Sequence, residues 1–217
     1  MTRLERGVVT AAALATVALL LPLAVLVRDG WPPLRRWDDR GEDLLRLRSH
    51  GVARDLALVV TQLGAPLLLE LAALALVVLF VRRQRPRLAG YVAISVFGAE
   101  VVSALLKVVV ARVRPCVDAA SCPGSTSFPS GHAVGAAAFW ITVAVLLLPA
   151  VGKRAWLLLV LPPVVALSRV LLGVHYPSDV LAGLLVGGCW AAASTALLSG
   201  WRSDSAHRDV PLEEVAS

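Results

Sequence analysis

Acidic residues are scarce in this sequence, and their scarcity narrows the possible functions. The chain of 217 residues has 15 Asp and Glu against 21 Lys and Arg, which gives a net charge of +6 and an isoelectric point near 10.0. Such an excess is typical of nucleic-acid-binding proteins when it follows one solvated face. Here the arginines stand in short clusters between apolar runs, so we expect no nucleic-acid partner and attribute the charge to membrane topology.

A cluster of metal ligands is also missing from the polar part of the sequence. Asp118 is the only acid between Lys107 and Asp179. Structural and catalytic metal sites need several carboxylate, imidazole or thiolate ligands in one place. The sequence therefore predicts a site without a metal or another cofactor.

The first apolar run lacks the small-residue cleavage site of a secretory signal peptide. Arg3 and Arg6 precede Val8–Val27 as in such a peptide, but the run is as long as a bilayer span and is followed by Arg28–Gly30. We expect an uncleaved first span.

Hydrophobic residues make up 58% of the chain and its mean hydropathy is +0.76, above the usual values of a soluble domain. Apolar runs that approach the roughly 20 residues of a membrane-spanning helix occur at Val8–Val27, Ala65–Val81, Leu88–Val110, Ala133–Leu148, Ala155–Val174 and Val180–Ser199. Helices satisfy their own backbone hydrogen bonds in lipid. The pattern predicts an all-α, polytopic membrane protein with a six-transmembrane-helix bundle in residues 1–200, followed by a polar, disordered cytoplasmic tail in residues 201–217.

Two segments between the runs bear on topology. Arg28–Asp55 holds two Trp, seven Arg and six acids, which suits a helix at the membrane surface, with a solvated loop as the alternative. Arg82–Arg87 is basic and free of acids, which indicates a cytoplasmic turn. With six spans both termini are cytoplasmic, and the segments Pro115–Pro129 and His175–Asp179 lie on the extracytoplasmic face of the plasma membrane.

The last of these segments joins an imidazole to a carboxylate. Asp179 follows His175 by four residues, close enough to accept a hydrogen bond from Nδ1 and leave Nε2 free as a nucleophile. Arg169 lies six residues before His175, where its guanidinium could bind phosphate oxygens. On its own, the segment is equally compatible with a solvated loop.

Two more polar groups precede it. Lys107 and Arg114 are seven residues apart, so we expect both to face one way at the end of a helix, although two snorkelling cations would look the same. Ser130 is a natural helix N-cap, and Gly131 lets an anion approach the free N–H groups of the first turn. His132 follows directly.

Together these groups predict phosphoryl transfer. His175, oriented by Asp179, attacks phosphorus, while a protonated His132 gives its proton to the leaving alkoxide and later takes one from water. The phosphoryl oxygens are stabilised by three cations and a helix N-terminus, namely Lys107, Arg114, Arg169, Ser130 and Gly131.

In these motifs the sequence resembles the type 2 phosphatidic acid phosphatases, or lipid phosphate phosphatases, of the superfamily that includes vanadium haloperoxidases. The family's pattern is Lys, six residues, Arg-Pro; then Pro-Ser-Gly-His; then Ser-Arg, five residues, His, three residues, Asp. The chain matches it without departure at Lys107 to Pro115, Pro129 to His132 and Ser168 to Asp179. The resemblance implies a phosphohistidine on His175, no metal, and a site at the outer membrane surface.

We therefore expect an integral membrane phosphatase acting on a lipid phosphate or a polyprenyl (pyro)phosphate. A haloperoxidase that holds vanadate is one alternative, against which the six spans argue because those enzymes are soluble. A non-catalytic lipid-binding or transport protein is another, against which the intact His132, His175 and Asp179 argue.

Cys116 and Cys122 are candidates for a disulfide on the outer face, with free thiols as the alternative.

Overall fold

The computed structural model describes residue 18 and residues 20–46, 51–115, 124 and 126–208, and every element in these ranges is helical. Residues 20–28 are helical and precede the first labelled element. In order along the chain, the elements are α2 (Pro32–Arg46), α3 (Val52–Val60), the 3-10 helix η1 (Thr61–Gly64), α4 (Pro66–Arg82), α5 (Pro86–Val110), α6 (Gly131–Val151), the 3-10 helix η3 (Gly152–Val160), α7 (Leu161–Leu171) and α8 (Pro177–Arg208).

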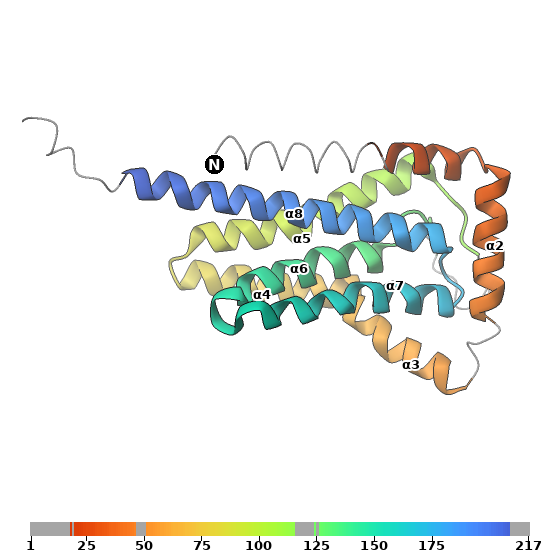
Figure 1. The fold of residues 1–217 in the computed structure, drawn as a ribbon, viewed down its shortest axis with the longest axis horizontal. Helices are drawn as coiled ribbons and strands as arrows, with labels where there is room; N and C mark the ends of the chain where they lie inside the picture. Colours follow the sequence, from red (N-terminus) through yellow and green to blue (C-terminus); the bar gives the residue numbers. More distant parts are fainter. Residues whose placement is uncertain (1–17, 19, 47–50, 116–123, 125, 209–217) are drawn as a thin grey trace, which may run out of the picture.

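The elements α4 to α8 run along one axis of the molecule, and α2 stands across one end (Figure 1). Four stretches of the described residues are long and apolar enough to cross a membrane, namely Val52–Arg82, Pro86–Val110, Gly131–Leu171 and Pro177–Leu197. Only 17% to 44% of the apolar window in each is buried inside the protein. The remaining apolar surface therefore suits contact with lipid.

The 41-residue stretch Gly131–Leu171 folds back on itself (Figure 1). Its first leg, α6, runs away from α2, and η3 with α7 returns toward it. Gly152, at φ 62, begins the return in a backbone conformation that favours glycine. The predicted runs Ala133–Leu148 and Ala155–Val174 correspond to these two legs, although the second helix already ends at Leu171.

The prediction of an all-α membrane protein is confirmed by these elements. The count of six spans stays a prediction, because most of the predicted first span, Val8–Val27, lies outside the described residues. The last helix continues past the predicted Ser199 to Arg208, and residues 209–217 lie outside the described part. The segment Arg28–Asp55, for which a surface helix and a loop were both open, contains α2 and the start of α3.

Small residues set the distance between α6 and α8 at the end near α2. A Cβ added to Gly183 would lie 2.7 Å from the Ser130 carbonyl oxygen and 2.8 Å from the Ala133 Cβ. Ala133 is itself fully buried. Small residues let two helices in a membrane approach closely, and here the approach holds the first turn of α6 against α8.

The end of α5 decides where Arg114 lies relative to Lys107. The helix stops at Val110 because Ala111 adopts a left-handed conformation, with φ 49, and donates its N–H to the Lys107 carbonyl oxygen at 3.0 Å. Arg114 lies beyond the helix, so the prediction that it shares a helical face with Lys107 is wrong.

Candidate active site

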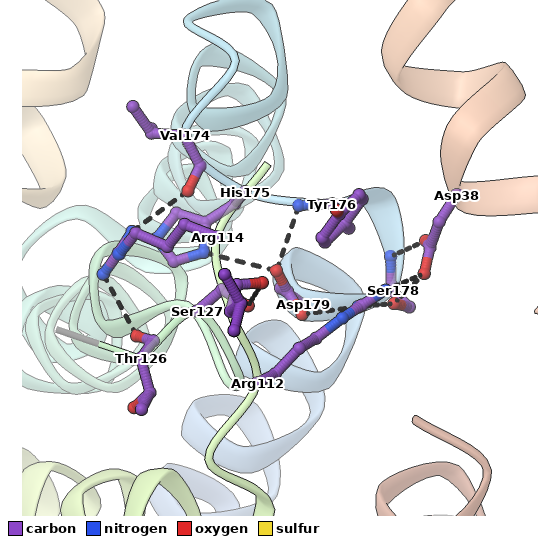
Figure 2. A network of polar contacts seen from close by, with 11 residues as sticks. Asp38, Arg112, Arg114, Thr126, Ser127, Val174, His175, Tyr176, Ser178 and Asp179 are labelled. Carbon is purple, nitrogen blue, oxygen red and sulfur yellow. Dashed lines mark hydrogen bonds and ion pairs between the residues drawn. The ribbon is translucent and has the colours of Figure 1, made fainter. Parts of the chain in front are cut away.

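The segment that carries Arg114 is held by residues near the start of α6. The backbone N–H of Ser127 donates to the Arg112 carbonyl oxygen at 2.8 Å, and its hydroxyl donates to the Val113 carbonyl oxygen at 3.3 Å. The Arg114 guanidinium then donates to the carbonyl oxygens of Val174, at 3.0 Å, and of Thr126, at 3.2 Å (Figure 2). These contacts aim Arg114 at the loop between α7 and α8.

His175 lies in that loop and is 1% exposed. Arg114 Nη1 is 2.8 Å from His175 Nε2. Because a guanidinium can only donate, Nε2 accepts this hydrogen bond and the ring proton of the neutral imidazole belongs on Nδ1. This is the tautomer that a nucleophilic Nε2 requires.

The predicted hydrogen bond between His175 and Asp179 is not formed in this structure. His175 Nδ1 lies 3.6 Å from Asp179 Oδ2, too far for a hydrogen bond, and Nδ1 has no hydrogen-bond partner. Other donors satisfy Asp179 instead, because its Oδ2 accepts from the Tyr176 N–H at 3.0 Å and its Oδ1 accepts from Arg112 Nη1 at 2.8 Å (Figure 2). The carboxylate still stands next to the ring, where it can stabilise an imidazolium.

Burial lowers the pKa of His175 to about 4, although the neighbouring Asp179 acts in the opposite direction. The positive charges of Arg114 and Arg169 contribute to the lowering. The imidazole is therefore neutral at pH 7, as a nucleophile must be.

The N-terminus of α6 lies beside these groups. Ser130 occupies the N-cap position, as predicted, but its hydroxyl makes no capping hydrogen bond and is buried without a partner. Its backbone N–H donates to the Asp179 carbonyl oxygen at 3.0 Å, which ties the start of α6 to the start of α8. Lys107 Nζ lies 3.1 Å from the place of a Cβ on Gly131, so a side chain there would crowd the ammonium group.

The two remaining predicted residues complete the group. Arg169, on α7, is 8% exposed and donates from Nη1 to the Thr61 hydroxyl at 2.8 Å, while its Nε has no partner. His132 interacts electrostatically with four groups of the site, namely Lys107, Arg114, Arg169 and His175. The structure thus brings together the residues that the sequence analysis assigned to phosphoryl transfer, from α5, α6, α7, α8 and the loops between them.

Three of these residues carry buried polar atoms without a hydrogen-bond partner, namely Ser130 Oγ, Arg169 Nε and His175 Nδ1. Buried polar groups are nearly always paired, and exceptions call for an explanation. A phosphate would supply acceptors for the Ser130 hydroxyl and the Arg169 guanidinium, and a small movement of Asp179 would supply one for Nδ1.

Sequence reasoning missed two residues, Arg112 and Asp38. Arg112 joins the carboxylates of Asp179 and Asp38, and Asp38 is fully buried although it lies on the surface helix α2. No motif pairs residues so far apart, and the acids of Arg28–Asp55 were interpreted as balancing charges at a membrane surface. The only sequence signal that could have pointed to Asp38 is its position within an amphipathic helix, and that signal is weak.

Comparisons with known proteins identify the family of the chain. The profile of the PAP2 superfamily matches residues 67–203. The chain is 42% identical over 123 residues to decaprenylphosphoryl-5-phosphoribose phosphatase of Mycobacterium tuberculosis, an alignment that covers 55% of this chain and 64% of that protein. It is 36% identical over 106 residues to phosphatidylglycerophosphatase B of Bacillus subtilis, with 45% and 52% covered. The chain thus spans less than two thirds of the length of either relative.

A solved structure has a similar fold. The crystal structure of a transmembrane PAP2-type phosphatidylglycerolphosphate phosphatase from Bacillus subtilis superposes with a TM-score of 0.72 at 25% sequence identity. The superposition covers 88% of this chain and 96% of that one. The resemblance inferred from the motifs is confirmed by these matches.

Proposed function

Because the chain belongs to the PAP2 superfamily, we propose that it is an integral membrane phosphatase that removes the terminal phosphate of a lipid phosphate or a polyprenyl (pyro)phosphate. The reaction runs through a phosphohistidine on His175 and needs no metal ion. The contacts around His175 and the cations at the N-terminus of α6 support this proposal.

The observation that carries the proposal is the 2.8 Å approach of Arg114 Nη1 to His175 Nε2. A phosphate bound by Arg114 would lie next to the nitrogen that must attack it. The same group would also meet Lys107 Nζ and the free N–H groups of the first turn of α6. Binding and attack therefore need only a local shift of Arg114 from the imidazole to a phosphate oxygen.

The reaction takes two steps. In the first, Nε2 of His175 forms a bond to phosphorus while the bond from phosphorus to the leaving oxygen breaks, and His132 donates a proton to that oxygen. In the second, His132 takes a proton from water, which attacks phosphorus and releases inorganic phosphate and free His175. The positive charges of Lys107, Arg114 and Arg169 repel a protonated His132. The negative charge of the bound phosphate offsets this repulsion, so His132 can hold a proton before the first step.

One carboxylate and three cations stabilise the charges that develop in the transition state. Asp179 is close enough to stabilise the positive charge that develops on the imidazole ring during attack. Lys107, Arg114 and Arg169 neutralise the equatorial phosphoryl oxygens, which is the dominant requirement in phosphoryl transfer.

The substrate class follows from the position of the site and from the relatives. The site lies at one end of a bundle whose long faces are apolar, so a lipid tail can stay in the membrane while its phosphate reaches the cations. The two relatives are named for a prenyl-linked phosphoribose and for phosphatidylglycerophosphate. The two names share a lipid that carries a phosphate. We propose a phosphate monoester or diphosphate on a lipid as the substrate class.

The location of the site is part of the same proposal. The acid-free turn at Arg82–Arg87 lies at the end of the bundle opposite to α2 (Figure 1). The positive-inside rule assigns such a turn to the cytoplasm. The site then faces the extracytoplasmic side of the plasma membrane, and both termini are cytoplasmic.

Purified protein should release phosphate from at least one of phosphatidic acid, phosphatidylglycerophosphate, decaprenylphosphoryl-5-phosphoribose and undecaprenyl pyrophosphate. His175→Ala should abolish this release while the protein elutes and melts like the wild type. Asp179→Asn should lower kcat by about two to four orders of magnitude, since the amide lacks the negative charge that stabilises the imidazolium formed during attack. Near-normal phosphate release by His175→Ala would refute the mechanism.

A further inference from the structure

A partly exposed arginine, Arg112, stands between two buried carboxylates beside His175. Arg112 donates from Nη1 to Asp179 Oδ1 at 2.8 Å and from Nη2 to Asp38 Oδ2 at 2.7 Å. Both carboxylates are fully buried, and the guanidinium also lies over the Tyr176 ring at 3.9 Å (Figure 2). One cation thus pairs with two anions, Asp179 on α8 and Asp38 on α2.

The charge balance of this group bears on the reaction. Attack on phosphorus places a positive charge on the His175 imidazole, which a neighbouring negative charge must stabilise. Arg112 alone would cancel the charge of Asp179 and leave a neutral pair. With Asp38 on the other side of the guanidinium, the three groups together carry one net negative charge.

Asp38 also fixes the chain that carries Asp179. Its Oδ1 accepts from the Ser178 backbone N–H at 2.9 Å, and its Oδ2 accepts from the Ser178 hydroxyl at 2.7 Å. These contacts fall at the first turn of α8, directly before Asp179. A side chain of α2 therefore sets both the place and the effective charge of the carboxylate beside the nucleophile.

We propose that Asp38 is a positioning residue of this enzyme, which acts through Arg112 to keep Asp179 effectively negative toward His175. The inference rests on the proposed phosphatase function. It also makes the site depend on the seating of α2 across the end of the bundle, because a displaced α2 would withdraw Asp38 and leave Arg112 to neutralise Asp179.

Asp38→Asn tests the proposal, with Asp39→Asn as a matched control. Asp39 is the next residue on the same helix, is exposed and takes no part in the ion pairs of Arg112. Asp38→Asn should lower kcat roughly 10- to 100-fold, the effect of one unit charge at a buried site, with KM changed less than about threefold. Asp39→Asn should match the wild type. Equal kcat values for the two variants would overturn the proposal.

The double variant Asp38→Asn/Arg112→Met separates a charge effect from simple anchoring. It removes one negative and one positive charge, so the remaining Asp179 again carries one net negative charge. The proposal expects this double variant to have a higher kcat than Asp38→Asn alone. A structural anchor predicts a lower one, because the double variant has lost more contacts, and that result would overturn the proposal.

If Asp38→Asn does not fold, the double variant Asp38→Asn/Arg112→Met is compared with the wild type, where a kcat within about tenfold supports the proposal and a larger loss refutes it.

These outcomes are distinct from a failure of the proposed function. Wild-type protein without activity on any lipid phosphate would remove the phosphatase proposal itself. A different pattern would remove only the role of Asp38. In it the wild type is active, His175→Ala is inactive, and Asp38→Asn has the activity of the wild type.

Discussion

Arg114 Nη1 lies 2.8 Å from His175 Nε2, so the guanidinium covers the nitrogen that we propose as the nucleophile. The contact selects the tautomer with its proton on Nδ1, and it keeps the cation that we propose to bind phosphate beside that nitrogen. Arg114 must then move from the ring to a phosphate oxygen when substrate binds, while Val174 and Thr126 continue to hold its other donors.

The first prediction concerns this exchange. Arg114→Lys should lower kcat/KM about 100-fold, because an ammonium lacks the planar set of donors that contacts carbonyl oxygens and phosphate together. Steady-state assays on the preferred lipid phosphate measure the effect, and Arg83→Lys in the exposed turn at the far end of the bundle is the control. Equal kcat/KM values in the two variants would exclude Arg114 from phosphate binding.

The sequence motifs predicted most of the residues that meet at the site, although not Arg112 and Asp38. Each motif follows directly from local chemistry: a histidine near a carboxylate, a serine and a glycine before a long apolar run, and cations at the ends of spans. The ends of one run were also predicted well, because α5 begins and ends within two residues of the predicted Leu88–Val110.

The path of the chain between motifs was not predictable. Ala111 takes a positive φ that alanine rarely adopts, and no glycine or proline marks the position. Its conformation ends α5 at Val110, and the chain beyond it brings Arg114 to His175. The contact between Asp38 and Arg112 joins residues 74 positions apart, and it depends on how α2 seats on the bundle rather than on any local pattern.

The second prediction is a pH dependence of stability. The pKa of His175 is lowered to about 4 by burial, against 6.5 for an ordinary histidine. Between these values the unfolded chain binds a proton that the folded chain does not, so stability is full above about pH 6.5 and falls on acidification toward pH 4. Acidification from pH 7 to 5 should cost about 2 kcal/mol through this residue.

Apparent melting temperatures in detergent at pH 7 and pH 5 measure this cost. The wild type should lose more than His175→Ala over this interval, because the variant no longer has the buried imidazole. Equal losses in the two proteins would show that His175 is not held neutral by its surroundings.

The third prediction concerns orientation. A cysteine at Gly124, where an added Cβ meets nothing within 4 Å, should react with a membrane-impermeant thiol reagent in intact cells. A cysteine at the exposed Gln84, in the turn between α4 and α5, should react only after the membrane is permeabilised. Both are made in a background without Cys116 and Cys122. The reverse pattern would place the site in the cytoplasm.

The fourth prediction concerns Cys116 and Cys122, which lie outside the described residues. Their spacing closes a short loop directly after Arg114-Pro115, on the side that we propose to be extracytoplasmic. A disulfide there would stabilise the protein by at most a few kcal/mol. Mass spectrometry of unreduced, alkylated protein should give a peptide with both residues bridged. Alkylation of both thiols would rule the bridge out.

The last prediction separates phosphoryl transfer to histidine from metal-assisted hydrolysis. Within the described residues, no three His, Cys, Asp or Glu side chains gather in the manner of a metal site. Lys107, Arg114 and Arg169 already offer three positive charges to a phosphoryl group, so a divalent ion has no charge left to neutralise.

Activity should therefore survive saturating EDTA and should be inhibited by orthovanadate. Vanadate can bond to Nε2 of His175 in a five-coordinate geometry that resembles the transition state, so it should bind more tightly than inorganic phosphate. Arg114→Lys should weaken vanadate inhibition together with kcat/KM, since both depend on the same cation beside the ring. Phosphate release measured with and without EDTA, and across a vanadate titration, checks both expectations. Loss of activity on chelation that returns with added Mg²⁺ or Zn²⁺ would mean that the three cations are not sufficient, and that a metal takes part in the reaction.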